Sequence, residues 1–573
     1  MKTLGVHDGH IATATLLCDG NIQASISEDR LNRIKEWHGL PEQAILKIFE
    51  ITNTKPGEID KVAFTSQQTP LTRDQLNLSK FSAKPFLFGT MNHMLPKSLM
   101  RKNWWVDFSN VFLKREKDET FSFFRKLGIP EQKITFVNHH LAHAYTLFLN
   151  FWQQNEDMLI LTLDGSGDGL SGTVNVSREP NKIRTIERIN TYNSLGTFYS
   201  RLTEYLGLKP LSHEYKVMGM AGYGNEKYFL PVYNKMREKF YTIDGLKFKN
   251  LSGCWGKDYL QRFSKEFKKT RFDNLCAGAQ KLVEELTIEW VNNAISETGI
   301  RNVFCSGGVF MNVKVNKRIL SEVEDLKKFF VFPSCGDESA SIGAAIYAYK
   351  ELCDTLGESF AIQPLGSIYW GPEYSNGDIK PLLKNYNYEY IEDIDHYTGK
   401  KLAEGKIIAR CTGKLEWGAR ALGNRSILAR ADDPRVVRKI NQMIKYRDFW
   451  MPFAATILAE RASEYIVNGK NIKSPYMIMS FDTTEKSRKD LIAGLHMYDS
   501  TCRPQVLEED WNPSFYKILK SFEKETGIGG ILNTSFNIHG DPIVNSPKDA
   551  LNTFENSGLD MLILNNFVLQ RKN

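Results

Sequence analysis

Short runs of alternating apolar and polar residues, separated by glycine turns, occur at two places in the chain. Near the N-terminus they predict strands at Thr3–Val6, His10–Cys18 and Asn21–Ser27, with turns at Asp8-Gly9 and Asp19-Gly20. The same order of strands and Asp-Gly turns returns over residues 158–189, where the first turn is expected at Asp164-Gly165. We interpret this as an internal repeat, which predicts two related halves that clasp a phosphate at their glycine turns. Two unrelated hairpins with common turn residues would give the same pattern.

Apolar residues at helical spacing predict a helix over residues 41–53 and a longer one over residues 275–295. Residues 66–127 are rich in aromatic and basic side chains and are interpreted as an insertion. A structural interpretation is a helical cap over a cleft. A functional interpretation is that this insertion recognises the acceptor substrate. The residues concerned are Phe86, Phe88, Lys97, Arg101, Lys102, Trp104, Trp105 and Phe112.

Glycine and proline residues at positions 355–374 indicate a linker. The chain has 573 residues, whereas a single hydrophobic core rarely grows past about 300 residues. We therefore expect an α/β protein with a first domain at residues 1–357 and a second domain at residues 358–573.

The composition is that of an ordinary globular protein, with 42% hydrophobic and 25% charged residues. A net charge of +7 suits small anionic substrates and gives no sign of a dedicated nucleic-acid surface. The eight cysteines are scattered without a C-x-x-C pair, so we expect reduced thiols in a cytoplasmic protein. The sequence has neither a signal peptide nor a run of about 18 apolar residues, so we expect no membrane partner.

The stretch from Val137 to Ala144 places His139 and His143 four residues apart, which on a helix puts both imidazoles on one face. Two imidazoles held in this way can share one metal ion. Asp164 and Asp337 each stand at the end of a predicted strand and are candidates for the remaining ligands. The alternatives are solvated or core histidines, and an ordinary helix N-cap role for Asp337.

A predicted strand leads into a Gly-Gly pair at positions 307 and 308, followed by a predicted helix. Bare glycine amides before a helix favour phosphate, although this signal alone does not identify a nucleotide site. The candidate nucleotide contacts of the first domain are Gly165, Gly307, Gly308 and Asn312.

The second domain carries basic residues among glycine, proline, asparagine and aromatic residues instead of on a clean amphipathic helix. Arginine offers a bidentate fork and lysine a point charge, so this setting favours a phosphate or carboxylate site over a solvated basic face. The basic residues are Arg420, Lys445, Arg447 and Arg503. Asn533 and Ser535, in a later polar stretch of the same domain, are added as candidates.

Ten motifs occur in one order along nearly the whole chain. They are Gly9-His10-Ile-Ala, Glu28-Asp-Arg-Leu with Lys35, His139 with His143, Asp164-Gly-Ser-Gly, Glu214-Tyr-Lys-Val-Met-Gly, Ser306-Gly-Gly with Asn312, Gly336-Asp337, Arg420-Ala-Leu-Gly-Asn-Arg-Ser-Ile-Leu, Thr501-x-Arg503-x-Gln505 and Asn533-Thr-Ser-Phe-Asn. Together they resemble the carbamoyltransferase family that includes the nodulation and antibiotic-tailoring O-carbamoyltransferases. The Arg420 and Asn533 motifs are highly specific as a pair.

The resemblance implies a first domain of the Kae1-like branch of the actin/Hsp70-type ATPase fold, with duplicated halves, and a second α/β domain similar to YrdC. It also implies a reaction in two steps. Carbamoyl phosphate and ATP, with Mg²⁺, give carbamoyl-adenylate and pyrophosphate in the second domain. The first domain then passes the carbamoyl group to an acceptor hydroxyl and releases AMP.

The resemblance assigns roles by motif. His139, His143, Asp164 and Asp337 match the metal ligands, for iron or zinc. His10 matches the residue that deprotonates the acceptor hydroxyl, a task that suits a neutral imidazole. Lys35, Arg420, Lys445 and Arg503 match positions that hold carbamoyl phosphate and the phosphates of ATP, to which we add Arg447, Asn533 and Ser535.

Two positions depart from the family pattern. Met451 stands where the family usually has arginine, so one phosphate contact is missing or comes from another residue such as Arg447. Glu338-Ser339 follow Asp337 where smaller residues are usual.

Three other functions fit part of the sequence. They are a tRNA threonylcarbamoyl-adenosine assembly factor, a metallohydrolase using the histidine pair, and a sugar-kinase-like sensor without catalysis. The mild charge counts against the first, the lack of a Glu beside His139 against the second, and the basic cluster against the third. We expect a small-molecule hydroxyl acceptor such as a sugar or natural product, and no nucleic acid. The sequence does not identify the acceptor, the metal or the oligomeric state, and a homodimer is one of the options.

Overall fold

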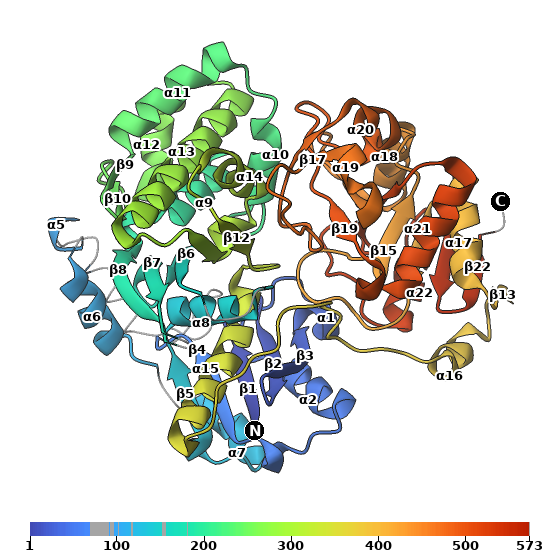
Figure 1. The fold of residues 1–573 in the computed structure, drawn as a ribbon, viewed down its shortest axis with the longest axis horizontal. Helices are drawn as coiled ribbons and strands as arrows, with labels where there is room; N and C mark the ends of the chain where they lie inside the picture. Colours follow the sequence, from blue (N-terminus) through green and yellow to red (C-terminus); the bar gives the residue numbers. More distant parts are fainter. Residues whose placement is uncertain are drawn as a thin grey trace. The chain divides into compact units, whose positions relative to one another are not determined.

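A computed structural model describes residues 1–68, 91, 97–100, 102–115, 118–151, 156–179 and 182–571. The chain forms two compact units, each with its own sheets and covering helices (Figure 1). Unit 1 comprises residues 1–28 and 37–365, and unit 2 comprises residues 29–36 and 366–573. Both units mix helices with sheets, so the expected α/β class is confirmed. Residues 29–36 belong to unit 2 although they lie early in the sequence, and no sequence pattern predicted this.

Unit 1 contains two five-stranded sheets with the same topology. The first has the order β3-β2-β1-β4-β5 and the second β12-β11-β6-β7-β8, so each places its first three strands antiparallel and adds two parallel strands beside the first. The strands are β1 (Lys2–His7), β2 (Thr13–Cys18), β3 (Asn21–Ser27), β4 (Lys61–Thr65) and β5 (Ile134–Val137), then β6 (Met158–Gly167), β7 (Leu170–Ser177), β8 (Arg184–Asn190), β11 (Asn302–Ser306) and β12 (Lys328–Val331). The internal repeat is therefore a true duplication, as the expected actin/Hsp70-type fold requires.

Two local expectations in these hairpins were wrong. Strand β2 starts at Thr13 and not at His10, because the backbone of Ile11 is left-handed at φ 57° and ends the extended run. Strand β6 continues through Asp164 with an irregular register, and the turn falls at Asp168-Gly169 instead. Both turn residues have positive φ, at 50° and 77°, as a tight hairpin turn demands. Asp164 therefore lies near the end of strand β6 and not in a turn.

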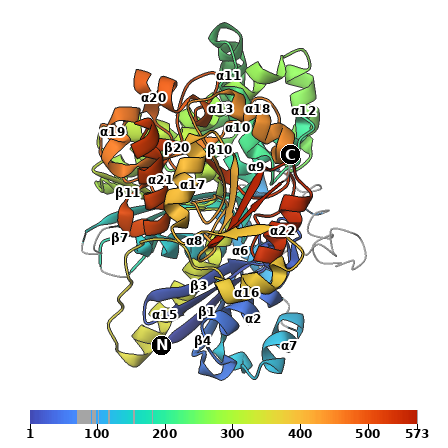
Figure 2. The ribbon, with the colours of Figure 1, turned by 90° about the vertical axis from the view of Figure 1, so that its right-hand side faces the viewer.

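Small residues let three elements of unit 1 come into close contact. Helix α15 (Ala340–Leu356) packs against β1 and against α8 (His139–Thr146), an arrangement visible in both views (Figures 1 and 2). A Cβ added at Gly343 would overlap the carbonyl group of Ala142, and one added at Gly5 would overlap the carbonyl oxygen of Ser341. The buried alanines Ala142, Ala344 and Ala348 fill the contact. Only glycine permits backbones to approach this closely.

Other helices of unit 1 complete its core. They include α2 (Glu42–Ile51) and α13 (Phe272–Thr298), which match the two helices predicted from apolar spacing. Helices α10 (Glu214–Ala221), α11 (Glu226–Lys239) and α14 (Val313–Glu322) pack against α13, α9 (Leu195–Tyr205) packs against β6, and α12 (Asp258–Phe267) packs against α9. The side chain of Trp290 on α13 is fully buried.

The predicted insertion is helical where the structure describes it, with α5 (Lys97–Met100), α6 (Asn103–Phe112) and α7 (Asp118–Lys126). On α6, the rings of Trp105, Phe108 and Phe112 form a stacked ladder. Trp105 is buried, whereas Trp104 is half exposed. Phe86, Phe88 and Arg101 lie outside the described residues.

Unit 2 is built on one mixed sheet of eight strands. The order is β13-β22-β21-β14-β15-β20-β16-β19. These strands are β13 (Tyr388–Tyr390), β14 (Ile408–Cys411), β15 (Arg425–Ala429), β16 (Ala454–Leu458), β19 (Gln505–Leu507), β20 (Gly530–Ser535), β21 (Met561–Leu564) and β22 (Phe567–Gln570), and the helices include α17 (Ile394–Ala403), α18 (Arg435–Ile440), α21 (Pro513–Thr526) and α22 (Pro547–Glu555). In the described part of the chain, no helix is both long and apolar enough to cross a membrane.

The close contact at Gly343 makes a stability prediction. Gly343→Ala should lower the free energy of unfolding of unit 1 by at least about 2 kcal/mol, because the new methyl group must push α15 away from α8. Urea unfolding of the full chain measures the loss. Gly57→Ala is the matched control, since a Cβ there meets no atom within 4 Å. Equal midpoints for the two variants would show that the helices can separate without cost.

Candidate functional site

Asn138 starts helix α8 and so sets the phase of its histidines. The side-chain oxygen of Asn138 accepts hydrogen bonds from the backbone N–H groups of His140 at 3.1 Å and Leu141 at 3.2 Å. This is the geometry of an N-cap. His139 and His143 are consequently one helical turn apart, with their Nε2 atoms separated by 3.1 Å, and both are buried.

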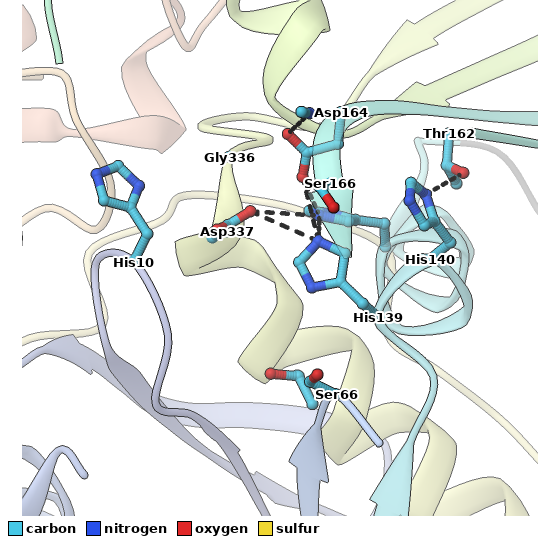
Figure 3. A network of polar contacts seen from close by, with 12 residues as sticks. His10, Ser66, His139, His140, Thr162, Asp164, Ser166, Gly336 and Asp337 are labelled. Atoms are coloured by element: carbon cyan, nitrogen blue, oxygen red, sulfur yellow. Dashed lines mark hydrogen bonds and ion pairs between the residues drawn. The ribbon is translucent and has the colours of Figure 1, made fainter. Parts of the chain in front are cut away.

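Two carboxylates from other elements meet this histidine pair. Asp164 comes from the end of β6, and Asp337 begins the short 3-10 helix η6 (Asp337–Ser339) ahead of α15 (Figure 3). The Oδ2 atom of Asp164 lies 3.1 Å and 3.4 Å from Nε2 of His139 and His143, and Oδ1 of Asp337 lies 3.6 Å and 3.8 Å from the same atoms. One ligand atom from each of the four residues lies within 4.8 Å of the others. The structure thus brings together all four residues that the sequence selected.

The electrostatics of this four-residue cluster are those of paired opposite charges. Burial opposes the charged form of the imidazole, but Asp164 and Asp337 raise the pKa of His143 to about 9. Burial likewise opposes ionisation of Asp164, yet His139 and His143 hold the pKa of its carboxyl well below the usual value. Two imidazole nitrogens and two carboxylate oxygens form a donor set that suits a divalent transition metal such as zinc or iron.

Asp168 holds the segments that present His139, a role that the sequence did not predict. Its carboxylate accepts hydrogen bonds from the His139 N–H at 2.8 Å, from Ser66 Oγ at 2.6 Å and from the backbone N–H groups of Gln67 and Gln68. The β6–β7 turn, the end of β4 and the start of α8 therefore meet on one buried carboxylate. Only its place in an Asp-Gly turn was visible in the sequence.

His10 lies in the loop between β1 and β2, apart from the four-residue cluster (Figure 3). Its ring packs against that of His38 with centroids 5.1 Å apart. The backbone carbonyl of His10 lies 3.1 Å from Nε2 of His7, whose Nδ1 lies 2.5 Å from Oγ1 of Thr65. His7 therefore fixes the loop that carries His10.

His7 lies beside Asp337 of the cluster, and the sequence analysis did not select it. Its Nε2 atom lies 4.0 Å from Oδ2 of Asp337, and its ring is buried. Burial lowers the pKa of His7 to about 4, so the ring is neutral at physiological pH. The available signal was a histidine at the last position of an apolar strand.

Glu338, which departs from the family pattern, is buried next to Asp337. Its Oε1 accepts a hydrogen bond from Ser334 Oγ at 2.5 Å, while Oε2 has no hydrogen-bond donor in the described ranges. Burial raises the pKa of the Glu338 carboxyl. Gly336 leaves room for this side chain, because a Cβ there would stand 2.5 Å from Oε2.

The candidate nucleotide residues of unit 1 fall into two groups. Gly307 and Gly308 pack against β6: a Cβ at Gly307 would overlap the Leu163 carbonyl, and one at Gly308 would lie 2.8 Å from Oδ1 of Asp164. Asn312 caps α14 and exchanges hydrogen bonds with Gln280. Gly165 has open space around its Cα. Gly307 and Gly308 thus serve close packing beside the four-residue cluster, whereas Gly165 does not, and the side-chain amide of Asn312 is already engaged.

Unit 2 gathers the predicted basic residues around Arg503. Burial, Arg420 and Arg447 together hold the pKa of Arg503 well below its usual value. Among the residues that the structure describes, none forms an ion pair with Arg503 or accepts a hydrogen bond from it. Arg447 lies over the ring of Phe453, 5.1 Å from its centroid, and reaches Thr534 Oγ1 at 3.4 Å. Three guanidinium groups thus gather in a setting that disfavours positive charge.

Lys445 lies beside the end of β20 and belongs to the same cluster. Its ammonium group donates hydrogen bonds to the backbone carbonyl and Oγ of Ser535 and to Oδ1 of Asn537 at 2.7 Å. Burial, Arg447 and Lys35 hold the pKa of Lys445 well below its usual value. Lys445 therefore fixes residues 535–537, and its charge adds to the cluster.

Lys35 reaches unit 2 because residues 29–36 are anchored there. The guanidinium of Arg33 donates hydrogen bonds to the carbonyls of Pro542 at 2.8 Å and Ile543 at 2.6 Å, and that of Arg30 to the Gly418 carbonyl at 3.0 Å. A segment from the first part of the chain thereby completes the cation cluster of unit 2.

Asn533 and Met451 have different roles in unit 2. The amide nitrogen of Asn533 donates hydrogen bonds to the Ala421 carbonyl, Thr456 Oγ1 and Gln505 Oε1, at 3.1–3.3 Å. Met451 is buried, so the position where the family usually has arginine contributes only packing.

Two family models match the chain. The model described as Carbamoyltransferase N-terminus matches residues 2–346, and the one described as Carbamoyltransferase C-terminus matches residues 399–571.

Among curated relatives, Uncharacterized protein MJ1051 of Methanocaldococcus jannaschii is 29% identical over 99% of both chains. Uncharacterized protein MJ1058 of the same organism is 32% identical, over 85% of this chain and 81% of its own length. Nodulation protein NolNO of Sinorhizobium fredii is 28% identical, over 99% of this chain and 79% of its own length.

Two solved structures resemble the chain at low similarity. The activator of 2-hydroxyisocaproyl-CoA dehydratase from Clostridium difficile, with bound ADPNP, has a TM-score of 0.31 at 13% identity and covers 63% of this chain and 100% of its own. HypF has a TM-score of 0.34 at 13% identity and covers 62% of this chain and 47% of its own. Scores this low do not bear on the function of this chain. The two family models, which together match most of the chain in the expected order, show that it belongs to the carbamoyltransferase family.

Proposed function

We propose that this carbamoyltransferase is an ATP-dependent O-carbamoyltransferase that acts on a small-molecule hydroxyl. In unit 2, the phosphoryl group of carbamoyl phosphate passes to water, which gives phosphate and carbamate. A carbamate oxygen then attacks the α-phosphorus of ATP, and the bond to the leaving pyrophosphate breaks, which gives carbamoyl-adenylate. In unit 1, the acceptor hydroxyl attacks the carbamoyl carbon, loses its proton, and displaces AMP.

One observation carries this proposal, the cation cluster around Arg503. Gathering Arg503, Arg420, Arg447 and Lys445 costs free energy, because each lowers the stability of its neighbour's charge. The cluster is therefore useful only with a strongly anionic occupant. Carbamoyl phosphate and ATP are such occupants, and donors placed before they bind also stabilise the charge that develops during phosphoryl transfer.

Unit 1 supplies the groups for the second step. His10 is the candidate general base for the acceptor hydroxyl, and His7 holds its loop through the His10 carbonyl. The residues His139, His143, Asp164 and Asp337 would hold a divalent metal, iron or zinc, and their donor set fits one. Such a metal would act as a Lewis acid and offset negative charge on a bound substrate. Asp168 and Asn138 keep the histidines oriented whether or not a ligand is present.

The adenylating half-reaction can be tested without knowing the acceptor. The full chain with ATP, Mg²⁺ and carbamoyl phosphate should release pyrophosphate, and release should depend on carbamoyl phosphate. Arg503→Ala should lower kcat/KM for carbamoyl phosphate by at least about 100-fold, because it removes a pre-placed donor. Arg435→Ala is the control, since Arg435 is exposed and paired with Asp433.

Two results would count against the proposal. Pyrophosphate release that continues without carbamoyl phosphate would remove the carbamoyl chemistry from unit 2. Absence of release combined with tight binding of tRNA would favour the tRNA-modification alternative.

The metal assignment makes a second prediction. Wild-type protein should bind one Zn²⁺ or Fe²⁺ per chain in unit 1, and His143→Ala should weaken binding by more than about 100-fold, because it removes a ligand and not only its support. Equilibrium dialysis with metal analysis gives the affinities. His213→Ala, outside the four-residue cluster, is the control. Unchanged stoichiometry and affinity in His143→Ala would refute the assignment.

The pKa of His143, about 9, gives the metal site a pH signature. Below that pKa the metal-free imidazole keeps its proton, so metal binding at pH 7–8 should release about one proton. The release should fall as the pH rises through 9, because His143 is then already neutral. Calorimetry of Zn²⁺ binding in two buffers of different ionisation enthalpy measures the proton count. A count that does not change between pH 7 and pH 10 would contradict the prediction.

A further inference from the structure

Residues 29–36, which we call the strap, leave unit 1 and return to it within one short stretch of chain. Glu28 is the last residue of unit 1 before the strap, and Trp37 is the first residue of unit 1 after it. The strap itself is part of unit 2. It is therefore a covalent connection from the unit that holds the cation cluster to the unit that holds His10.

Both ends of the strap bond to the same residue, Ala12, two positions after His10. The backbone N–H of Glu28 donates a hydrogen bond to the Ala12 carbonyl at 2.9 Å, and the Ala12 N–H donates one to the Trp37 carbonyl, also at 2.9 Å. We call these two bonds the Ala12 clamp. Ala12 is fully buried, so bulk water does not replace either bond. Both backbone polar groups of Ala12 thus depend on where the strap begins and ends.

The residues that follow the strap also contact the loop that carries His10 (Figure 3). The ring of His38 packs on the ring of His10, with centroids 5.1 Å apart. The Gly39 N–H donates a hydrogen bond to the Asp8 carbonyl at 3.0 Å. Together with Trp37, these residues form one side of the loop, so a shift of this segment would move the imidazole of His10.

The His10 loop has a strained backbone that needs this support. Ile11 has a φ of 57°, in the left-handed region that a β-branched residue rarely adopts. Strain of this kind persists only where the surrounding bonds enforce it. Here those bonds include the Ala12 clamp and the Thr13 hydroxyl, which donates to the Ile11 carbonyl at 2.9 Å. A weaker clamp should therefore let the loop relax and release His10 from its position.

Within unit 2, two arginines anchor the strap. Arg33 donates to two consecutive backbone carbonyls, and Arg30 donates to the carbonyl of Gly418, two residues before Arg420 of the cation cluster. The backbone of Arg33 is left-handed at φ 60°, and that of Glu36 at φ 56°. The path of the strap is therefore strained as well, and it depends on these anchors.

Lys35 makes the strap sensitive to what the cation cluster holds. Its positive charge disfavours the charged form of Lys445, and so lowers the pKa of that ammonium group. The empty cluster therefore repels Lys35, because like charges repel at short range. A bound anion attracts Lys35 instead. The force on the strap changes sign when an anion binds, and this difference is what allows a ligand to shift the position of the strap.

We propose that the strap positions His10 according to the occupancy of the cation cluster of unit 2. With an anion bound, Lys35 is held at the cluster, the Ala12 clamp is tight, and the strained loop presents His10. With the cluster empty, repulsion loosens the strap and the loop relaxes. The inference rests on the proposed function, in which His10 acts only after unit 2 has bound its substrates. Trp37 and His38 are then positioning residues for the transfer step.

Inorganic pyrophosphate is the probe, because it is a stable and strongly anionic product of the reaction proposed for unit 2. At saturating pyrophosphate, hydrogen exchange of the backbone amides of residues 9–13 should slow by at least about threefold, because the ligand stabilises the clamped loop. Hydrogen-exchange mass spectrometry of the full chain measures the change. Strand β7, in the second sheet of unit 1, is the internal control and should not respond.

Arg503→Ala tests whether the response begins at the cation cluster. Pyrophosphate at a concentration that saturates the wild type but not this variant should leave the exchange of residues 9–13 unchanged. A full response in Arg503→Ala without binding in unit 2 would show that pyrophosphate acts from another site, and would overturn the proposal.

Arg33→Met separates coupling through the strap from ordinary loop stability. It removes the anchor but keeps Lys35 and the residues of the Ala12 clamp. At its own saturating pyrophosphate concentration, the exchange of residues 9–13 should change by less than about 1.5-fold. Arg435→Met is the matched control, since Arg435 is exposed and paired with Asp433, and should respond like the wild type. If Arg33 has only a structural role, exchange will rise equally with and without pyrophosphate, and the intact response would overturn the proposal.

The remaining outcomes distinguish the strap from the proposed function. Calorimetric binding of pyrophosphate that is lost in Arg503→Ala, without any response of residues 9–13, would overturn the strap and leave the proposed function standing. A normal response in a protein that forms no adenylate would support the strap and remove the proposed function. Absence of pyrophosphate binding would overturn both. If Arg33→Met does not fold, the comparison of the wild type with Arg503→Ala still decides.

Discussion

The close approach of α15 to β1 and α8 determines where the chemistry of unit 1 can occur. Gly343 and Gly5 remove the side chains that would otherwise hold these backbones apart. The contact brings the start of α15, with Asp337 just before it, against the helix that carries His139 and His143. Asp164 enters from the neighbouring sheet. The two glycines allow this tight contact, and four ligand atoms from three separate segments converge as a result.

The two units use opposite electrostatics. Unit 1 buries carboxylates against imidazoles, and each partner favours the charged form of the other. Unit 2 brings like charges together, and each of Arg503 and Lys445 disfavours the charge of its neighbours. Paired charges need no ligand to be stable, whereas the like-charged cluster is at its most stable only with an anion bound. Anion binding should therefore stabilise unit 2 in particular, by the usual linkage between ligand and fold.

Regular spacing made part of this architecture predictable. The i, i+4 histidine pair, the repeated hairpins and the helix around Trp290 follow from local periodicity, and the structure has each of them. Features that depend on tertiary contacts were not visible. His7 belongs to an apolar strand by pattern, and only the fold brings it to Asp337. The assignment of residues 29–36 to unit 2 depends on Arg33 meeting two distant carbonyls.

The anionic nature of the proposed intermediate connects the two sites. Carbamoyl-adenylate keeps a negatively charged phosphate, which the donors of unit 2 suit and the carboxylates of Asp164 and Asp337 repel. Without a metal, the protonated imidazole of His143 offsets only one of these two negative charges, so the site still disfavours the anionic intermediate. A divalent cation held by the four-residue cluster would reverse the sign of the local charge. Under the proposed function, the carboxylates that bind the metal therefore also make binding of carbamoyl-adenylate in unit 1 depend on that metal.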